Sequence, residues 1–152
     1  MARSRIFGKI LNPIIKSILK SPLHSLMSDR SLVIRYMERE SGRANSFPAY
    51  YQRAGNSLLV LVEKAEDWWR DLRNGANVKV VIKGSEQRGW AEALQNPDVI
   101  TENLIQLLRA IPELSMELEI RQDEHGVYLK EDINRILQQY GLLNVDLQAE
   151  QA

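Results

Sequence analysis

The sequence predicts an α+β domain in which about six mostly antiparallel strands close into a small barrel, with an N-terminal helix and further helices around it. Short apolar segments separated by hairpin turns predict the strands. Residues 58–62 form a continuous apolar run, which is typical of a strand buried on both faces. The length of 152 residues suits one domain with its own core.

Residues 6–27 predict an amphipathic helix, because apolar residues recur there at spacings of three and four, with a kink at Pro13. Residues 1–28 carry five Lys or Arg and no Asp or Glu. We assign residues 1–30 to a helical segment that packs on the barrel and residues 31–148 to the barrel, within a single domain. The same pattern also fits a helix that docks on an anionic membrane surface, so peripheral membrane contact stays an alternative.

The strands and helices after residue 30 follow from changes in periodicity. Strands are expected at 31–37, 45–53 and 58–62, then 78–83, 87–94 and 142–147. Helices are expected at 68–74 with Asp67 as N-cap, from Asn96-Pro97-Asp98 with Asp98 as the candidate cap, and at 131–140, ended by Gly141. Residues 113–130 show no clear pattern, and Pro48 indicates an edge or a bulge in the second strand.

Composition excludes several classes of site. The chain has no cysteine, which excludes disulfides and thiolate metal sites, and its two histidines lack the spacing of a zinc site. The net charge of zero argues against a nucleic-acid partner. No segment has the length of a membrane-spanning helix, so we expect a cytoplasmic protein with membrane association as the alternative.

Four motifs follow one another in the first half of the barrel. They are the turn Glu38-Arg39-Glu40-Ser41-Gly42-Arg43, the strand segment Pro48-Ala49-Tyr50, the apolar strand at 58–64, and Trp68-Trp69-Arg70-Asp71-Leu72. In their order and spacing they resemble the deazaflavin-dependent nitroreductase and quinone reductase family. That family has a split β-barrel and belongs to the flavin-reductase-like, FMN-binding barrels. The resemblance covers nearly the whole chain.

The resemblance implies a cofactor site and an activity. The phosphate end of the cofactor would meet Arg39, Ser41, Gly42, Arg43 and Arg70; its ring would lie beside Pro48, Tyr50, Leu61 and Trp69; and Lys64 would approach the ring or the substrate. The implied cofactor is an 8-hydroxy-5-deazaflavin coenzyme, with FMN as runner-up. The implied reaction transfers a hydride from the reduced coenzyme to a small quinone or nitro-type acceptor. The cofactor carries this chemistry, so we assign no catalytic residue and no metal ligand.

Some positions depart from the family pattern. Glu38 and Glu40 stand where the family turn has a glycine and a basic residue, and Glu63 stands at the end of the apolar strand where the family has a small or hydroxyl residue. Carboxylates repel a phosphate at short range. Two alternatives therefore remain open: a cofactor-free, degenerate barrel that acts as a binding module, and an FMN or haem barrel. For the turn itself, the alternative to a phosphate clamp is a solvated connection whose charges pair with one another. The oligomeric state, monomer or homodimer, also stays open.

Overall fold

The computed structural model describes residues 31–148. The helix predicted at 6–27, and with it the segment 1–30, lies outside the described residues.

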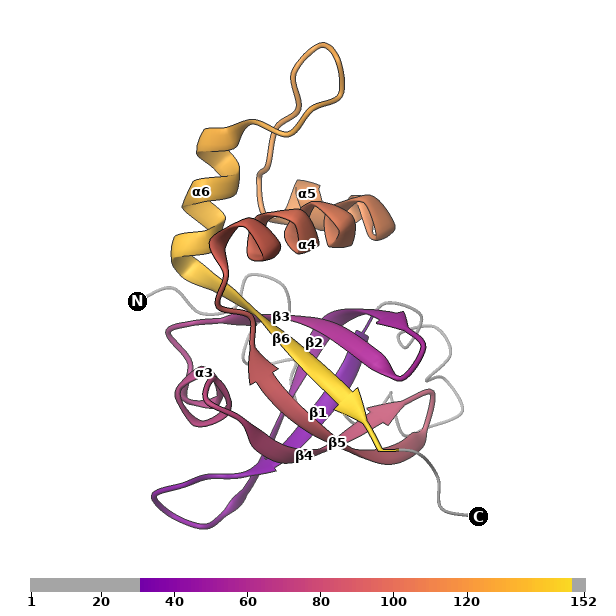
Figure 1. The fold of residues 1–152 in the computed structure, drawn as a ribbon, viewed down its shortest axis with the longest axis vertical. Coiled ribbons are helices and arrows are strands. Elements are labelled where there is room, and N and C mark those ends of the chain that lie inside the picture. Colours follow the sequence, from indigo (N-terminus) through magenta and orange to yellow (C-terminus); the bar gives the residue numbers. More distant parts are fainter. Residues whose placement is uncertain (1–30, 149–152) are drawn as a thin grey trace.

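Six antiparallel strands close into a barrel in the order β1-β2-β3-β6-β5-β4 (Figure 1). Their bounds are Ser31–Met37 for β1, Ala44–Ala54 for β2, Ser57–Glu63 for β3, Ala76–Ile82 for β4, Ser85–Ala93 for β5 and Tyr140–Leu147 for β6. The α+β class and the closed antiparallel barrel are thus confirmed. Sequential hairpins supply the β1-β2, β2-β3 and β4-β5 pairs, and β6 inserts between β3 and β5.

The barrel interior is filled by alternate residues of the strands. On β3 these are Leu58, Val60 and Val62, while Leu61 points outward beneath the helices. The apolar run at 58–62 is therefore continuous because β3 faces the barrel core on one side and a helical layer on the other.

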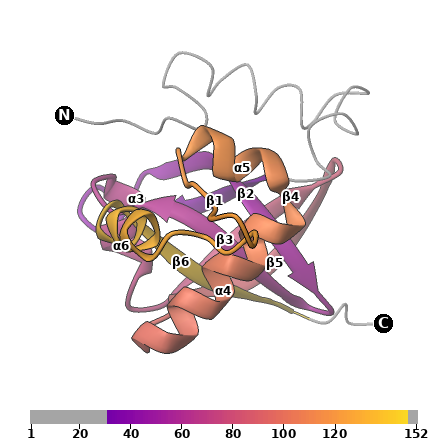
Figure 2. The same cartoon turned by 90° about the horizontal axis from the view of Figure 1, so that it is seen from above.

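The helical layer consists of α4 (Pro97–Ala110), α5 (Pro112–Glu117) and α6 (Lys130–Gln139), and α3 (Asp67–Leu72) lies at the side of the barrel (Figures 1 and 2). A second apolar cluster joins the layer to the outer face of β3 and β6. From α4 it takes Leu104, Leu107 and Leu108, all fully buried.

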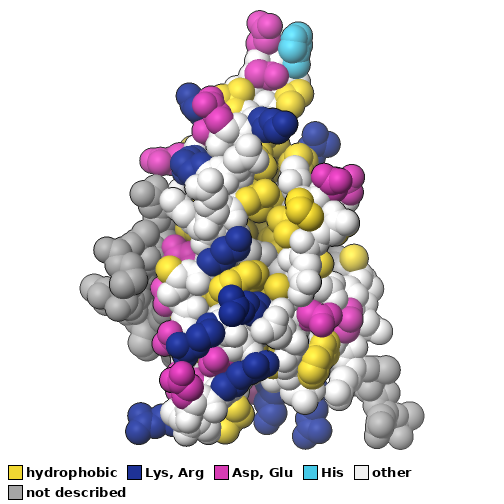
Figure 3. All heavy atoms as spheres, turned by 60° about the vertical axis from the view of Figure 1, so that its left-hand side comes forward, with side chains coloured by type: hydrophobic (Ala, Val, Ile, Leu, Met, Phe, Trp, Pro, Cys, Tyr) yellow, Lys and Arg dark blue, Asp and Glu magenta, His cyan; other side chains and the backbone are white. Residues whose placement is uncertain are grey.

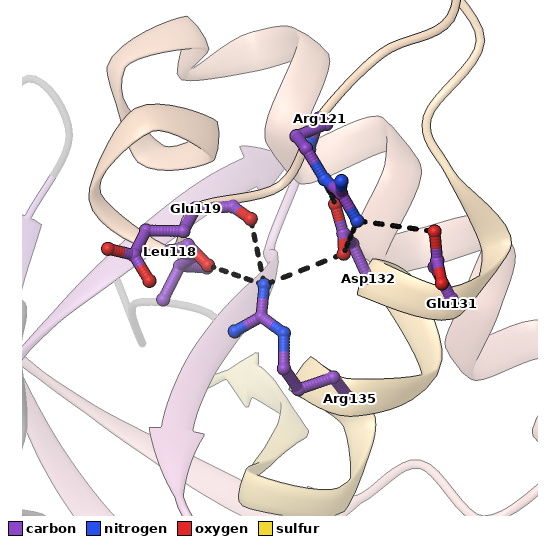
Figure 4. Close-up of polar contacts among 6 residues, drawn as sticks. All are labelled: Leu118, Glu119, Arg121, Glu131, Asp132 and Arg135. Carbon is purple, nitrogen blue, oxygen red and sulfur yellow. Dashed lines mark hydrogen bonds and ion pairs between the residues drawn. The ribbon is translucent and has the colours of Figure 1, made fainter.

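Residues 113–130, which the sequence left unassigned, contain α5 and a long loop that returns to α6. The loop is held by arginine contacts (Figure 4). Arg121 contacts Asp132 through its Nε at 2.9 Å and its Nη2 at 3.1 Å, and Arg135 Nη2 donates to the carbonyls of Leu118 and Glu119. These contacts fasten the start of the loop, residues 118–121, to α6.

Three local expectations differ from the structure. Asn96, not Asp98, caps α4, because its Oδ1 accepts from the backbone N–H groups of Asp98 and Val99. Asp67 is the first residue of α3 rather than its cap. Gly141 does not end α6: the helix ends at Gln139, and Gly141 already belongs to β6. Position 141 has to be a glycine because the ring of Trp69 packs directly on it.

Candidate functional site

A groove with a volume of about 250 Å³ lies where α3, α4, α6 and β6 meet. Its apolar lining includes Leu94, Ile100, Leu137 and Leu142, and its polar lining includes Thr101 and Asn134. Two of the residues singled out by the sequence, Lys64 and Trp69, also line it. The groove is thus an apolar slot with a cation and a few polar groups along its wall, the composition that small-molecule sites share.

The two adjacent tryptophans of α3 have different surroundings. Trp68 stacks on Phe47 with ring centroids 4.5 Å apart and an interplanar angle of 18°, and it packs against the barrel core. Trp69 forms a wall of the groove and packs on Gly141, where an added Cβ would overlap its ring. Gly141 therefore brings the indole of Trp69 up to the backbone of β6.

Lys64 follows the end of β3 and reaches over the groove toward α6. Its Nζ donates to the carbonyl of Leu137 at 2.9 Å and lies 5.8 Å from the centroid of the Trp69 ring. An ammonium at that distance from an indole face is within the range of a cation–π contact. A cation and an aromatic wall from the sequence-predicted set thus stand side by side.

A buried carboxylate lies next to this pair. Glu63 is only 7% exposed, and the Tyr140 hydroxyl donates to its Oε1 at 3.2 Å. Glu63 and Tyr140 are cross-strand partners on the outer face of β3 and β6. The carboxylate is therefore engaged by a phenol that itself lines the groove.

The turn between β1 and β2 is closed by its own hydrogen bonds. The Glu38 carboxylate accepts from Ser41 Oγ at 2.6 Å and from Asn45 Nδ2 at 3.1 Å. The backbone N–H of Gly42 donates to the Glu38 carbonyl, and that of Arg43 donates to Ser41 Oγ. The Ser41 hydroxyl and the backbone N–H groups of Gly42 and Arg43 are thus used within the turn.

The three arginines of the predicted phosphate end lie on two elements. Arg39 Nη2 donates to the carbonyl of Gly75, the residue before β4, at 3.1 Å. Arg43 is exposed on the turn, which Figure 1 shows at the end of the barrel away from α4, α5 and α6. Arg70, on α3 beside Trp69, lies 3.9 Å from Asp67 and 3.6 Å from Asp71.

Of the remaining predicted ring contacts, Leu61 and Tyr50 pack against the helical layer. Leu61 is 3% exposed within the second apolar cluster. Pro48 is buried on the outer face of β2, and the Tyr50 hydroxyl donates to Glu117 Oε1 of α5 at 3.0 Å. The structure therefore brings Lys64 and Trp69 together in one groove and places the other predicted residues elsewhere around the barrel.

Sequence reasoning missed the α6 and α4 side of the groove. Asn134, Leu137 and Thr101 come from helices whose amphipathic pattern reveals a buried face but not the groove at its edge. The position of Gly141, directly before a segment that alternates with period two, is also compatible with a strand residue, but the sequence pattern predicted the end of a helix there.

Figure 3 shows this side of the molecule. A strip of hydrophobic side chains lies between the helical part and the barrel, and Lys and Arg side chains gather along it and over the barrel below. Within residues 31–148, no set of three or more His, Asp or Glu side chains is grouped to hold a metal ion. None of the helices in that part of the chain is long and apolar enough to span a membrane.

No protein-family model matches the chain, and no curated protein matches it in sequence. Solved structures do match its fold. A candidate pyridoxamine 5'-phosphate oxidase from Listeria innocua superposes with a TM-score of 0.53 and 12% identity over 90% of this chain and 94% of that one. A candidate 5-nitroimidazole antibiotic resistance protein from Bacteroides thetaiotaomicron gives 0.53 and 15% over 95% and 82%. The general stress FMN/FAD binding protein from Xanthomonas citri gives 0.50 and 19% over 95% and 88%.

The chain has the split-barrel fold. At these identities the likeness concerns the fold, which hosts more than one function. Within this split barrel, the groove beside Trp69 is the feature whose chemistry can be argued from the chain's own residues.

Proposed function

We propose that this split barrel binds a flavin-type cofactor with its ring against Trp69, and that it acts as an oxidoreductase on a small acceptor. The observation that carries the proposal is the groove itself, in which an indole wall and the ammonium of Lys64 face one apolar slot. A flat, electron-poor ring system needs such a surface to stack on and polar groups at its edge.

The residues of the groove fit the ring of such a cofactor. Leu137 and Leu142 supply apolar contacts, and Asn134 and Thr101 can hydrogen bond to the polar edge of a ring. The volume of about 250 Å³ lies below that of a typical drug-sized site, roughly 300–1,000 Å³. The groove therefore suits the ring system, and the rest of the cofactor would lie on the surface.

The residues predicted to bind the phosphate end of the cofactor fit it less completely than the groove fits the ring. Since Glu38 engages Ser41 and Asn45, the groups left to attract a phosphate are guanidinium groups. They are those of Arg43 in the turn, of Arg70 on α3, and of Arg39, which already donates to the Gly75 carbonyl. Ser41 and Gly42 would then act by shaping the turn. We expect the phosphate to contribute less to affinity than the ring does.

Two cofactors satisfy these requirements. The motif resemblance favours the 8-hydroxy-5-deazaflavin coenzyme, and the fold shared with the FMN/FAD binding protein of Xanthomonas citri favours FMN. When bound and reduced, either group would supply a hydride to a quinone or nitro-type acceptor. Lys64, the cation that lies over the Trp69 wall of the groove, would hold the anionic edge of the ring or the acceptor.

The closed turn favours a second candidate function. A turn whose carboxylate, hydroxyl and backbone groups satisfy one another is what a cofactor-free barrel would keep. In that case the groove would bind an apolar partner or ligand without redox chemistry.

A titration with both cofactors separates the two candidates. The purified chain is titrated with the deazaflavin coenzyme and with FMN, and cofactor fluorescence is followed. We expect saturable binding that weakens about tenfold in Lys64→Met, the size of one lost charged contact. Lys130→Met, which removes an exposed lysine at the start of α6, is the matched control and should bind as the parent does. If neither cofactor binds the parent chain, the cofactor-free function replaces our proposal.

A further inference from the structure

β1 and β4 pair with each other over only part of their length. β1 and β4 pair only at Val33 with Val81, Ile34 with Val80 and Arg35 with Lys79. Beyond Arg35 the two strands continue, β1 to Met37 and β4 back to Ala76, without pairing to each other. A cavity of about 560 Å³ lies at this seam, lined by Tyr36 and Met37 on one side and by Asn77 and Val78 on the other.

Three cations stand in one row across the seam. Arg35 on β1 is the cross-strand partner of Lys79 on β4, and Lys79 is the partner of Arg88 on β5. All three are exposed on the outer face and line the cavity. Like charges directly opposite one another destabilise a sheet. An arrangement of this kind is stabilised when an anion lies among the three groups.

Within residues 31–148, one carboxylate supplies part of the negative charge that these three cations need. Glu86 contacts Arg35 at 2.9 Å and Lys79 at 4.0 Å. Among the described residues, the Arg88 guanidinium has no ion-pair partner. Three cations against one carboxylate leave two positive charges on the row. The missing counter-charge is therefore that of a dianion.

We propose that this seam, defined by Arg35, Lys79, Arg88 and Asn77, binds a small molecule through a dianionic phosphate group. A phosphate monoester carries close to two negative charges near neutral pH, and the planar fork of an arginine matches its oxygens in a bidentate way. The Asn77 amide and Gln148, which also lines the cavity, add donors for the remaining oxygens. The volume of about 560 Å³ leaves room for the organic part of the ligand.

The seam shares no lining residue with the groove beside Trp69. It is therefore a second site, and its occupancy does not depend on the proposed cofactor.

Isothermal titration calorimetry with inorganic phosphate, adenosine 5'-monophosphate and adenosine tests the proposal. We expect the two phosphates to bind and adenosine not to bind, with affinity falling as salt rises. Arg88→Gln should weaken phosphate binding about tenfold, the loss of one charged hydrogen bond. Arg88→Lys should recover part of it, because the charge returns without the fork. Arg109→Gln, on the exposed last turn of α4, is the control and should bind as the parent does.

The opposite results would overturn the site. Absence of phosphate binding at millimolar concentration, equal binding of adenosine, or an equal loss in Arg109→Gln would each show that the seam does not recognise a phosphate. Riboflavin titrations distinguish the two sites, because riboflavin has the flavin ring but no phosphate: Arg88→Gln should leave riboflavin affinity unchanged, and a matching loss would mean that the seam binds the flavin ring instead of a phosphate. Circular dichroism checks that each variant is folded.

Discussion

The indole ring of Trp69 packs directly on the backbone of Gly141, so closely that a Cβ at position 141 would overlap the ring. Gly141 is the second residue of β6, directly after the strand begins at Tyr140. The contact joins α3 to β6 and sets the position of the aromatic wall of the groove. A single hydrogen atom in place of a side chain thus decides where the proposed ring-binding surface lies.

Gly141→Ala should therefore both destabilise the barrel and alter the groove. Adding a methyl group to a packed contact forces side chains from their rotamers and costs about 1–3 kcal/mol. We expect the free energy of unfolding in urea to fall by that amount, and tryptophan fluorescence of the folded state to change as Trp69 moves.

The Trp69→Leu background provides the control for this prediction. Leucine removes the ring atoms that the new methyl group would meet, so the cost of Gly141→Ala should shrink in the double variant. An equal cost in both backgrounds would show that the alanine acts through the backbone of β6 and not through Trp69.

The barrel could be predicted because its strands obey simple alternation. β3 was identified by a continuous apolar run, and the structure explains that run by two different clusters, Val60 in the interior and Leu61 beneath the helices. The junction between α6 and β6 could not be predicted in the same way. A glycine after a helical pattern usually marks the helix end, and only the distant ring of Trp69 shows why Gly141 lies in a strand.

The candidate site was predicted only in part for a related reason. Lys64 and Trp69 are near each other in sequence, and the short α3 brings them to one groove. The facing wall is formed by Asn134 and Leu137, about seventy residues later in the sequence. Their position at the groove depends on how the helical layer packs on the barrel. Likewise, the sequence shows that Glu38 stands in the turn, but it does not predict that the Ser41 hydroxyl donates to the Glu38 carboxylate, because that hydrogen bond depends on the conformation of the turn.

Tyr140→Phe tests the contact between the groove and the buried carboxylate. The substitution keeps the ring and removes the hydroxyl that donates to Glu63 Oε1 at 3.2 Å. Loss of a hydrogen bond to a buried charged group costs about 1–3 kcal/mol. We expect urea unfolding to report that loss, while Tyr128→Phe, which removes a hydroxyl in the partly buried loop before α6, should cost less. A neutral Tyr140→Phe would show that the Glu63 carboxylate does not depend on this donor.

Tyr36 should give the protein a distinct alkaline transition. Burial raises the pKa of its phenol from 10.0 to about 12, and the charges of Asp71 and Glu38 add to the shift. The neutral phenol is favoured in the folded state, so its contribution to stability is complete below about pH 10 and is lost as the pH rises to about 12. Phenolate absorbance at about 295 nm should therefore show one tyrosine titrating late, together with unfolding.

Tyr36→Phe identifies the residue responsible. The late phenolate signal should disappear in this variant, and the free energy of unfolding should depend less on pH between about 10 and 12. Persistence of the late signal would assign it to another of the buried tyrosines.

Asp132 should govern how the helical layer responds to acid. The hydrogen bonds from the Arg121 side chain, followed by the one from its backbone N–H, lower the pKa of the Asp132 carboxyl from 3.8 to about 2. A carboxyl whose pKa is lowered by folding stabilises the folded state at every pH above its pKa in the unfolded chain. That contribution is lost as the pH falls from about 4 to about 2. We expect Asp132→Asn to be less stable than the parent near neutral pH and the difference to shrink as the pH approaches 2.

Glu131→Gln is the matched comparison for this acid response. Glu131 also contacts Arg121, at 3.2 Å, but its side chain is 73% exposed, where an ion pair contributes little. Unfolding followed by circular dichroism between pH 5 and pH 2 should give this variant the pH dependence of the parent. If Glu131→Gln and Asp132→Asn lose the same pH dependence, the response belongs to the whole exposed cluster around Arg121. If only Asp132→Asn loses it, the single carboxylate at the start of α6 holds the return of the loop to the helical layer.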